Sequence, residues 1–350
     1  MRISSTNILT LGPAYRCPKG GIAQVLHTYY QFVYENMKHI QISGGDNMIK
    51  KIWIVFRALI LLNLKLIFDK NIQIIHIHTA SNNDFWRSSL FVTVAKIYKK
   101  KVVLHIHGGG FKEYYEQNRS FVDSVLVKSN AIISLSEYWL DFFKNELGYL
   151  NTHIVHNIIP EPIVQEFPSD GKCHLLYLGH IYQKKGIFDL VDVILNNRKE
   201  YSGKLKLHIG GGLFETGKLK TLLTNYRAED LITFHGWVDG KEKTKLLNIA
   251  NAYILPSYAE GIPISILEAM SYHLPIISTK VGGIPDIVDD TCGILVEPGN
   301  LQQLKDAIDV LIYSREEFEE RGNVAYLRSL LHHPNQIIAE LNEIYKELSN

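Results

Sequence analysis

Residues 252–286 read AYILPSYAEGIPISILEAMSYHLPIISTKVGGIPD, which predicts a strand, a loop, a helix and a second strand. The apolar run 252–255 predicts a buried parallel strand, and residues 275–278 predict a second one. Between them, ISILEAMSY predicts a helix with Pro263 in its first turn, where a missing N–H costs nothing. The loop before the helix therefore brings Glu260 to a helix N-terminus, whose amides and dipole attract anions.

Glu260 and Glu268 are eight residues apart on this loop and helix. At ~1.5 Å per helical residue, the two carboxylates are expected to lie on the order of 10 Å apart. This separation suits two carboxylates that bind hydroxyl groups at two ends of one ligand. An acid–base pair around a glycosidic bond would need facing carboxylates about 5–10 Å apart, so hydrolysis is not the favoured chemistry.

The string EGIPISILEAM, followed by Gly282, Gly283, Pro285 and Asp286, resembles the retaining GT-B glycosyltransferases of the family-4 type, the glycosyl transferases group 1. The resemblance spans nearly the whole chain and is strongest over residues 231–300. It implies an α/β chain with two Rossmann-like, doubly wound parallel-sheet domains that face each other across a cleft. It also implies a nucleotide-diphosphate sugar as donor and retention of the anomeric configuration.

The composition is that of an ordinary soluble protein with two domains. The chain has 350 residues, more than one core usually supports. Its 37 basic residues nearly balance 36 acidic ones, so nothing indicates a nucleic-acid partner. The three cysteines, Cys17, Cys173 and Cys292, give neither a disulfide framework nor a CxxC metal pair, which favours a reducing compartment. The N-terminus predicts a first strand and no signal peptide.

Short apolar runs alternate with helical patterns along the chain, as in doubly wound parallel sheets. We expect strands at 7–11, 39–42, 72–78, 101–107, 131–135, 153–156, 174–179, 204–209, 232–235, 253–255, 276–278 and 293–296. In the first half we expect helices at 22–36, 49–68, 84–99, 113–128 and 137–147. Ligands of such folds bind beyond the carboxyl ends of the strands, so the site is expected between the domains.

The predicted domain boundaries follow from this alternation. Residues 1–160 form an N-terminal, acceptor-side domain, and 161–172 form a linker that contains Pro162 and Pro168. Residues 173–330 form the domain that binds the donor nucleotide. Residues 331–350 predict a terminal helix with one apolar face, which in this type of fold crosses back to the first domain.

The segment 49–68, IKKIWIVFRALILLNLKLIF, leaves two interpretations open. It has no uncharged run of 18 residues, so it is a poor transmembrane span. One interpretation is a helix packed on the sheet. The other is a basic amphipathic surface that touches an anionic membrane, and both can hold on different faces of the helix.

Gly20 and Gly21 end the segment that follows the first strand, just before a predicted helix. Glycine lets backbone amides approach a phosphate closely. The segment lacks GxGxxG, so the nicotinamide fingerprint is absent where it should occur. The family resemblance implies that both glycines contact the distal phosphate of the donor.

Two His-x-His pairs, His76/His78 and His105/His107, end two neighbouring strands. Strand alternation puts each pair on one face, which raises a zinc site as an alternative. No cysteine or acidic residue has ligand-like spacing, and the family needs no metal, so we expect no metal and interpret His76, His78 and His105 as structural histidines whose nitrogens are satisfied.

His107 begins HGGGFKEYY, which resembles the family's His-Gly loop beside the donor sugar. The resemblance implies that His107 senses a sugar hydroxyl and supports positive charge at the anomeric carbon. Lys112, Glu113 and Tyr114, with Tyr115 next in line, are candidates for the acceptor side.

Residues 175–190, LLYLGHIYQKKGIFDL, match the family's phosphate-binding loop. Lys185 occupies the family's lysine position, but His180 stands where family members usually carry arginine. A neutral imidazole offers one donor and no charge, whereas arginine offers a permanent bidentate fork. The sequence leaves three explanations open: the bound diphosphate protonates His180, Lys184 or Arg16 supplies the charge, or phosphate binding is weaker.

Two further segments, 212–219 and 235–238, resemble nucleotide-binding motifs. Residues 212–219, GLFETGKL, nearly form a P-loop but end in Leu219, which cannot bind Mg²⁺, so an ATPase or kinase is disfavoured. HGWV at 235–238 matches the family's strand end near the base, where Gly236 would admit a planar ring.

The resemblance then assigns roles around the central loop. Glu268 would accept hydrogen bonds from the ribose, and Glu260 from a hydroxyl of the donor sugar. The amides of Gly261 and Ile262, beside Pro263, would hold the sugar or the diphosphate. His107, Lys185 and Glu260 are the candidate catalytic residues, and no cofactor is expected besides the nucleotide sugar.

We therefore expect a retaining hexosyltransferase that uses a nucleotide-diphosphate sugar, with UDP favoured, and a glycan or lipid-linked saccharide as acceptor. By family analogy it would act in bacterial surface polysaccharide synthesis, in the cytoplasm or at the inner face of the plasma membrane. Two alternatives remain: a nucleotide-sugar epimerase on the same fold, and a non-catalytic nucleotide-sugar-binding protein.

Overall fold

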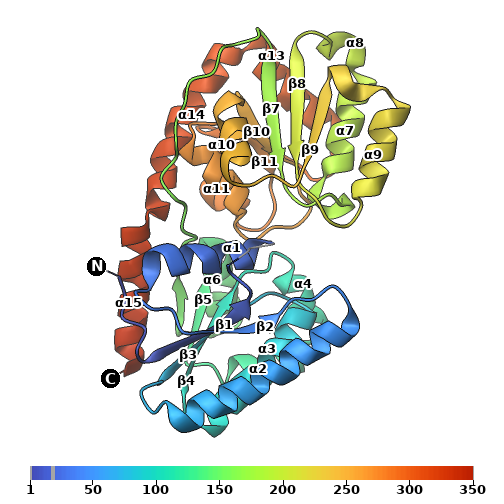
Figure 1. Ribbon diagram of the computed structural model, residues 1–350. Coiled ribbons are helices and arrows are strands. Elements are labelled where there is room, and N and C mark those ends of the chain that lie inside the picture. The colour runs from blue at the N-terminus through green and yellow to red at the C-terminus, as the bar shows by residue number, and fades with distance from the viewer. Residues whose placement is uncertain (1, 17–19, 350) are drawn as a thin grey trace. The chain divides into compact units, whose positions relative to one another are not determined.

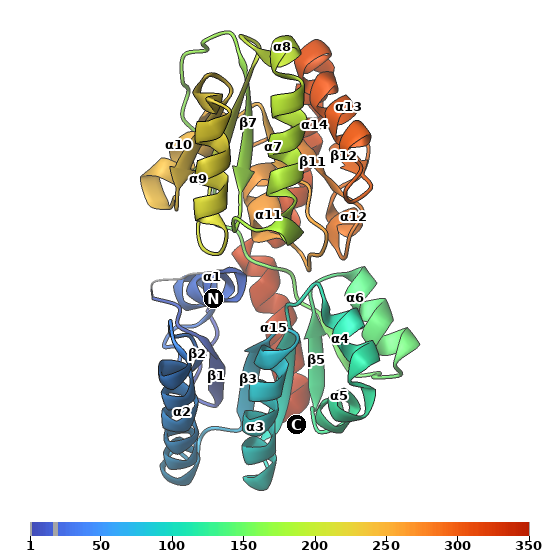
Figure 2. The same ribbon diagram turned by 90° about the vertical axis from the view of Figure 1, so that its right-hand side faces the viewer.

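The computed structural model describes residues 2–16 and 20–349, which form two compact units. The first unit comprises Met1–Pro160 and His332–Asn350, and the second comprises Glu161–Leu331. Each unit contains a six-stranded parallel sheet with helices on both faces (Figures 1 and 2). Cys17 lies outside the described residues, whereas Cys173 and Cys292 are buried.

The first sheet has the strand order β2-β1-β3-β4-β5-β6. Its strands are β1 (Ile8–Pro13), β2 (His39–Ser43), β3 (Ile74–Thr79), β4 (Lys101–Ile106), β5 (Ala131–Ser134) and β6 (Thr152–Ile154). Its helices are α1 (Gly21–Thr28), α2 (Met48–Phe68), α3 (Asn83–Ile97), α4 (Phe111–Gln117), α5 (Arg119–Leu126), α6 (Glu137–Asp141) and α15 (Pro334–Ser349). The chain first builds outward from β1 to β2 and then returns to β3, so the topological switch point lies between β1 and β3.

The second sheet has the order β12-β11-β10-β7-β8-β9. Its strands are β7 (Cys173–Leu178), β8 (Leu205–Gly210), β9 (Ile232–Gly236), β10 (Ala252–Leu255), β11 (Ile276–Thr279) and β12 (Gly293–Val296). Its helices are α7 (Ile187–Asn196), α8 (Arg198–Tyr201), α9 (Thr216–Asn225), α10 (Gly240–Ile249), α11 (Ile264–Ser271), α12 (Ile284–Ile287), α13 (Leu301–Tyr313) and α14 (Arg315–Ser329). Here the switch point lies between β7 and β10.

The central strands are apolar because helices cover both of their faces. All six residues of β3 and all four of β10 are buried. Leu9, Ile75 and Leu104 belong to the core of the first sheet. All the strands expected from the sequence are present, with ends that differ by at most two residues.

Several helix expectations are corrected. Residues 113–128 do not form one helix, because Asn118 leaves the helical region with φ −136° and ψ 30° and separates α4 from α5. The helix expected at 22–36 ends at Thr28 and continues as a π-helical turn, Tyr29–Val33. A second π-helical turn, Phe142–Glu146, follows α6. Pro263 precedes α11 with an extended backbone instead of lying in its first turn.

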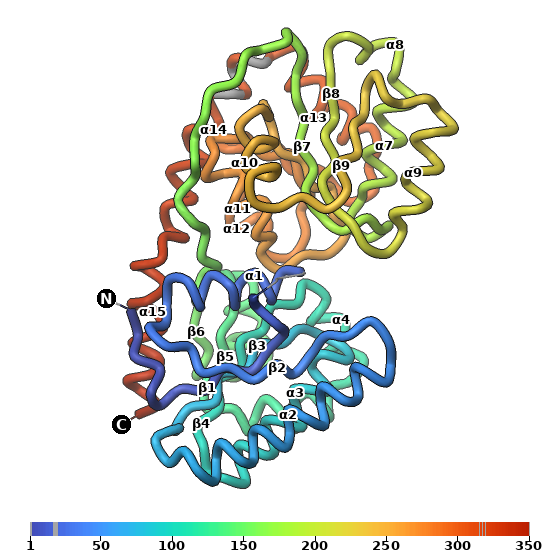
Figure 3. The backbone as a smooth tube through the Cα atoms, in the orientation of Figure 1, coloured from blue at the N-terminus to red at the C-terminus, as the bar shows by residue number. Residues whose placement is uncertain are grey.

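The C-terminal helix α15 is part of the first unit, as the path of the chain in Figure 3 shows. The hydroxyl of Tyr345 lies 2.6 Å from the hydroxyl of Tyr34 and 2.6 Å from Nδ1 of His76. Residues 161–170 have no regular secondary structure and belong to the second unit. There the amide of Ile163 donates to the hydroxyl of Tyr272, 3.1 Å away.

Candidate functional site

The loops after β7 and β10 meet at the switch point of the second sheet. Nζ of Lys185 lies 2.5 Å from Oε1 of Glu260, and the Ser257 hydroxyl donates to the same oxygen at 2.8 Å. The side chains of Lys185 and Glu260 are only 20% and 9% exposed. Lys185 and Glu260, to which the sequence analysis assigns separate roles, therefore form one ion pair that is shielded from water.

Two glycines allow these loops to approach each other. Gly186 has φ +67°, and a Cβ there would lie 1.9 Å from the carbonyl oxygen of Pro256. Gly282, after β11, has φ +52°, and a Cβ there would lie 1.9 Å from the carbonyl oxygen of Glu260. A side chain at either position would displace the backbone around Glu260.

The backbone beyond Glu260 is also fixed. The amide of Gly283 donates to the carbonyl of Gly261 at 3.0 Å, and Gly261, Ile262 and Pro263 are buried. The N-cap residue of α11 is Pro263, which makes no side-chain capping hydrogen bond, and the helix begins at Ile264. A helix N-terminus without a capping side chain leaves amide donors for an anion.

Glu268, on α11, pairs with a lysine that the sequence analysis did not single out. Nζ of Lys243, on α10, lies 2.6 Å from Oε1 of Glu268. The two side chains are 27% and 13% exposed. Glu268 is therefore shielded from water and held in place by Lys243. No sequence signal distinguishes Lys243 from Lys241 and Lys245 on the same helix.

His180 lies among aromatic side chains. Its ring centroid is 5.6 Å from that of Phe214 and 6.2 Å from that of Trp237, which is nearly parallel to it. Both aromatic residues are exposed, at 72% and 47%. Leu213 and Phe214 have positive φ angles of 65° and 48°, a backbone conformation that non-glycine residues adopt at a cost. Neither aromatic residue was expected at the site.

The surroundings of His180 disfavour a positive charge on its imidazole ring. Burial, and then the positive charge of Lys185, lower the pKa of His180 below its ordinary value. Its Nδ1 is buried and has no hydrogen-bond partner among the described residues. The imidazole is therefore neutral near pH 7 and offers no fixed charge to a diphosphate. Lys184 is exposed in the same loop, and Arg16 is exposed in the first unit.

Gly236 ends β9, immediately before Trp237. Its φ of +73° favours glycine, and among the described residues no heavy atom beyond the chain neighbours lies within 4 Å of the position where a Cβ would stand. The space beside this backbone is therefore open, as the sequence analysis expected for a ring.

The first unit contains a pocket of about 430 Å³ at the carboxyl ends of β1, β2 and β3. The residues around it are Pro13, Gly20, Gly21, Ile22, Ala23, Ile42, Ser43, Gly44, Gly45, Lys51, His78, Asn83, Asp84, Arg87 and Ser88. It includes the N-terminus of α1 and lies at the switch point between β1 and β3.

The cations of this pocket were missed by the sequence analysis. Arg87 contacts Asp84, and its Nε is buried without a partner among the described residues. Burial lowers the pKa of Arg87, although a guanidinium remains charged. Lys51 adds a second positive charge, so Gly20 and Gly21 lie in a pocket suited to an anion.

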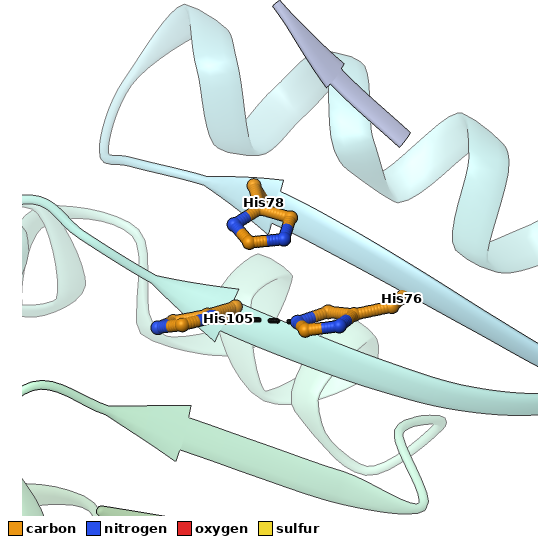
Figure 4. Close-up of side chains that lie close together, drawn as sticks. All are labelled: His76, His78 and His105. Atoms are coloured by element: carbon orange, nitrogen blue, oxygen red, sulfur yellow. Dashed lines mark hydrogen bonds between the residues drawn. The ribbon is translucent and has the colours of Figure 1, made fainter. Parts of the chain in front are cut away.

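Four histidines gather beside this pocket, three of which are drawn in Figure 4. His105 and His107 stack with ring centroids 4.1 Å apart, and Nδ1 of His78 lies 3.0 Å from Nε2 of His107. Burial lowers the pKa of His76 and of His107 to about 3, and it also lowers the pKa of His78 and of His105 well below the ordinary value. All four rings are therefore neutral at pH 7.

The expectation of satisfied structural histidines holds for His76, whose nitrogens contact Tyr345 and His105. It is wrong for His78 and His105, because Nε2 of each has no partner among the described residues. Neutral imidazoles can bind zinc, but the nearest nitrogens of His76, His78 and His105 are spread over up to 4.8 Å. Zn–N bonds of ~2.0–2.1 Å would require these nitrogens to lie roughly 3.4 Å from one another. The rings would therefore have to rotate before the three histidines could bind zinc.

The acceptor-side candidates on α4 do not line this pocket. Lys112 pairs with Glu146, with Nζ 2.9 Å from the carboxylate, and lies over the ring of Phe142. Tyr114 is buried against Phe85. Glu113 and Tyr115 are also outside the set of residues around the pocket.

Comparisons with known proteins agree with this geometry. The sequence model of the glycosyl transferases group 1 family matches residues 161–328. The chain is 28% identical to the putative colanic acid biosynthesis glycosyltransferase WcaL of Salmonella typhimurium over 195 residues, which cover 51% of this chain and 46% of that protein. It spans about a third to a half of the length of the first curated relatives.

The whole chain also resembles solved structures. Sucrose-phosphate synthase from Thermosynechococcus elongatus matches with a TM-score of 0.78 at 16% identity, covering 98% of this chain and 99% of that one. HepE from Anabaena, solved in complex with UDP and glucose, matches with a TM-score of 0.74 at 17% identity, covering 97% and 99%. These likenesses show a common fold.

Proposed function

We propose that the chain is a retaining glycosyltransferase, because residues 161–328 match the glycosyl transferases group 1 family model and the chain has the GT-B fold. It moves a hexose-type sugar from a nucleotide-diphosphate sugar to a glycan or lipid-linked saccharide. The observation that carries this proposal is the shielded contact between Lys185 and Glu260 at the switch point of the second sheet.

In this proposal the second unit binds the donor. Lys185 and the uncapped N-terminus of α11 stabilise the negative charge of the departing diphosphate. Glu260 accepts a hydrogen bond from a sugar hydroxyl, and Glu268, held by Lys243, accepts those of the ribose. Phe214 and Trp237 offer aromatic faces near His180, which suits a planar base.

The first unit contributes neutral and cationic groups. Gly20, Gly21, Lys51 and Arg87 suit a phosphate of the donor. His107, kept neutral by burial and oriented by His78, serves as a hydrogen-bonding group for a sugar hydroxyl. The departing diphosphate takes the proton of the acceptor hydroxyl, so the reaction needs no protein nucleophile and no metal.

A UDP-sugar is the favoured donor, and HepE, whose fold this chain shares, was solved with UDP and glucose. A role in polysaccharide synthesis is supported by the similarity to WcaL, a putative colanic acid biosynthesis glycosyltransferase. The non-catalytic alternative, a nucleotide-sugar-binding protein, is supported by the neutral His180 where the family carries arginine.

Product analysis by proton NMR separates these functions. The full chain is incubated with UDP-sugars, with and without a glycan acceptor, beside a Lys185→Met variant. We expect UDP release and a new sugar anomer identical to that of the donor, both lost in the variant. An isomerised donor without acceptor would indicate an epimerase, and binding without turnover would indicate a binding protein.

A further inference from the structure

The helix α2 has an apolar outer face exposed to solvent. Ile49, Trp53, Phe56, Ile60, Leu64 and Ile67 follow one another at spacings of three or four residues, so they form one stripe along the helix. Every one of these side chains is at least 44% exposed, and Ile49 reaches 80%. Soluble surfaces rarely expose so many large apolar side chains in one row.

The opposite face of α2 accounts for its attachment to the sheet. Ala58, Leu62 and Leu66 are buried and lie among the core residues of the first unit. The helix contacts β2, an edge strand, and α3 (Figures 1 and 2). The outer stripe is therefore not needed to hold the helix in place.

The charges on α2 all have one sign. The helix carries Lys50, Lys51, Arg57 and Lys65 and no acidic residue. Lys50 pairs with Asp46, which precedes the helix, and Lys51 lines the pocket. Arg57 forms no ion pair within the described residues and is exposed on the flank of the apolar stripe.

From this stripe and its cations we propose that α2 docks the protein on an anionic bilayer surface. The apolar side chains would enter the boundary between head groups and acyl chains, while the flanking cations would meet anionic lipids. The indole of Trp53 suits that interface, since it is apolar with one polar N–H. Among the described residues, no helix combines the length and apolar character that crossing a membrane requires.

A second copy of the chain is a poorer occupant of the same stripe. Pairing two α2 helices would bring together two sets of cations with no acidic residue on either helix. Like charges brought together across an interface oppose association. An anionic lipid surface satisfies the apolar stripe and the charges together.

The test is flotation of the full chain with vesicles of phosphatidylglycerol and phosphatidylethanolamine, beside vesicles of phosphatidylcholine. We expect flotation with the anionic vesicles and at least tenfold less with the neutral ones. A double variant, Phe56→Glu with Ile60→Glu, should lose at least tenfold of the bound fraction. The matched control, Ile97→Glu with Val127→Glu, changes two exposed residues elsewhere in the unit and should bind as wild type.

A second measurement places Trp53 itself. Replacing Trp86, Trp139 and Trp237 by phenylalanine leaves Trp53 as the single tryptophan, and its emission should shift to shorter wavelength with anionic vesicles. No flotation and no shift would overturn the proposal. So would a dimer that the Phe56/Ile60 variant converts to a monomer without any vesicle binding. Nucleotide binding by the second unit, measured on the wild-type chain and on the Phe56/Ile60 variant, is independent of these outcomes.

Discussion

Lys185 and Glu260, which are 75 residues apart in the sequence, form an ion pair with Nζ 2.5 Å from Oε1. They come from the loops after β7 and β10, the two strands that flank the switch point of the second sheet. Both side chains are shielded from water. Removing either one would therefore leave the other without its ion-pair partner, which destabilises the fold.

Lys185→Met should therefore lower the free energy of unfolding by about 2–3 kcal/mol, because Glu260 remains shielded without its cation. Adding Glu260→Gln to this variant should restore part of the loss. Denaturant unfolding of the two single variants and the double variant measures the coupling. As a control, Lys280→Met breaks an ion pair with Glu297 that is 54% exposed on both sides and should cost less than about 1 kcal/mol. Equal losses at both lysines would contradict the account.

Glu268→Ala should weaken UDP binding by roughly 10-fold or more, since a carboxylate that accepts ribose hydrogen bonds contributes about 1.5–3 kcal/mol. Lys243→Met should weaken it less, because the lysine only holds the carboxylate. Lys245→Met, an exposed position on the same helix, should leave binding unchanged. Isothermal titration with UDP gives all three values, and wild-type affinity in Glu268→Ala would reject the ribose assignment.

The affinity for a UDP-sugar should rise as the pH falls from 8 to 6. The pKa of His180 is lowered in the unliganded protein, and a bound diphosphate would raise it, so binding takes up a proton at the lower pH. His180→Arg should bind about 10-fold more tightly at pH 8 and lose this pH dependence. If His180→Arg has wild-type affinity at both pH values, protonation of His180 is not how the chain replaces the missing arginine.

The buried histidines predict a steep loss of stability in acid. In the folded chain the pKa of His76 and of His107 is about 3, below the value of 6.5 for an exposed histidine. As the pH falls below 6.5, the unfolded chain takes up protons first, so stability is full above 6.5 and is lost towards pH 3. Each histidine adds about 1.4 kcal/mol per pH unit to the slope.

Denaturant unfolding between pH 8 and pH 4.5 measures this slope. His105→Gln should reduce the slope by about 1.4 kcal/mol per pH unit, the contribution of one proton, because burial also lowers the pKa of His105. His27→Gln, at a partly exposed position on α1, is the control for replacing a histidine outside the cluster. A stability that does not change from pH 7 to pH 5 would show that the cluster is hydrated or charged in the folded state.

Chelation should not affect turnover. In the proposed reaction, Lys185 and backbone amides would supply the positive charge that a metal would otherwise provide, so we expect activity within twofold after EDTA. A large loss that Mg²⁺ or Zn²⁺ restores would contradict this expectation. If the metal failed to restore activity in His78→Gln, the metal site would be assigned to His76, His78 and His105.

The strands and the loops at their carboxyl ends could be predicted from the sequence. Apolar runs of the right length predict strands. In a parallel sheet, the loops after β7 and β10 must emerge at the same edge. The proximity of Lys185 and Glu260 follows once these two strands are neighbours. The break at Asn118 did not follow, because α4 and α5 together read as one helix.

The partners of the predicted residues could not be derived in the same way. Lys243 faces Glu268 because of how α10 packs against the sheet, and three lysines on that helix looked equivalent. Arg87 enters the pocket from α3 for a similar reason. The register that sets His78 beside His105 on adjacent strands belongs to the pairing of β3 with β4, which no local pattern encodes.

We expect the second unit to bind a nucleotide-diphosphate sugar. A thermal-shift panel of UDP, GDP, ADP and their sugars, run on wild type and Glu268→Ala, measures this binding. A ligand at 100 times its Kd should stabilise the protein by about 2.7 kcal/mol, with UDP ligands giving the largest shift and Glu268→Ala losing most of it. If no nucleotide or nucleotide sugar raises the Tm of the wild-type chain, the account is contradicted.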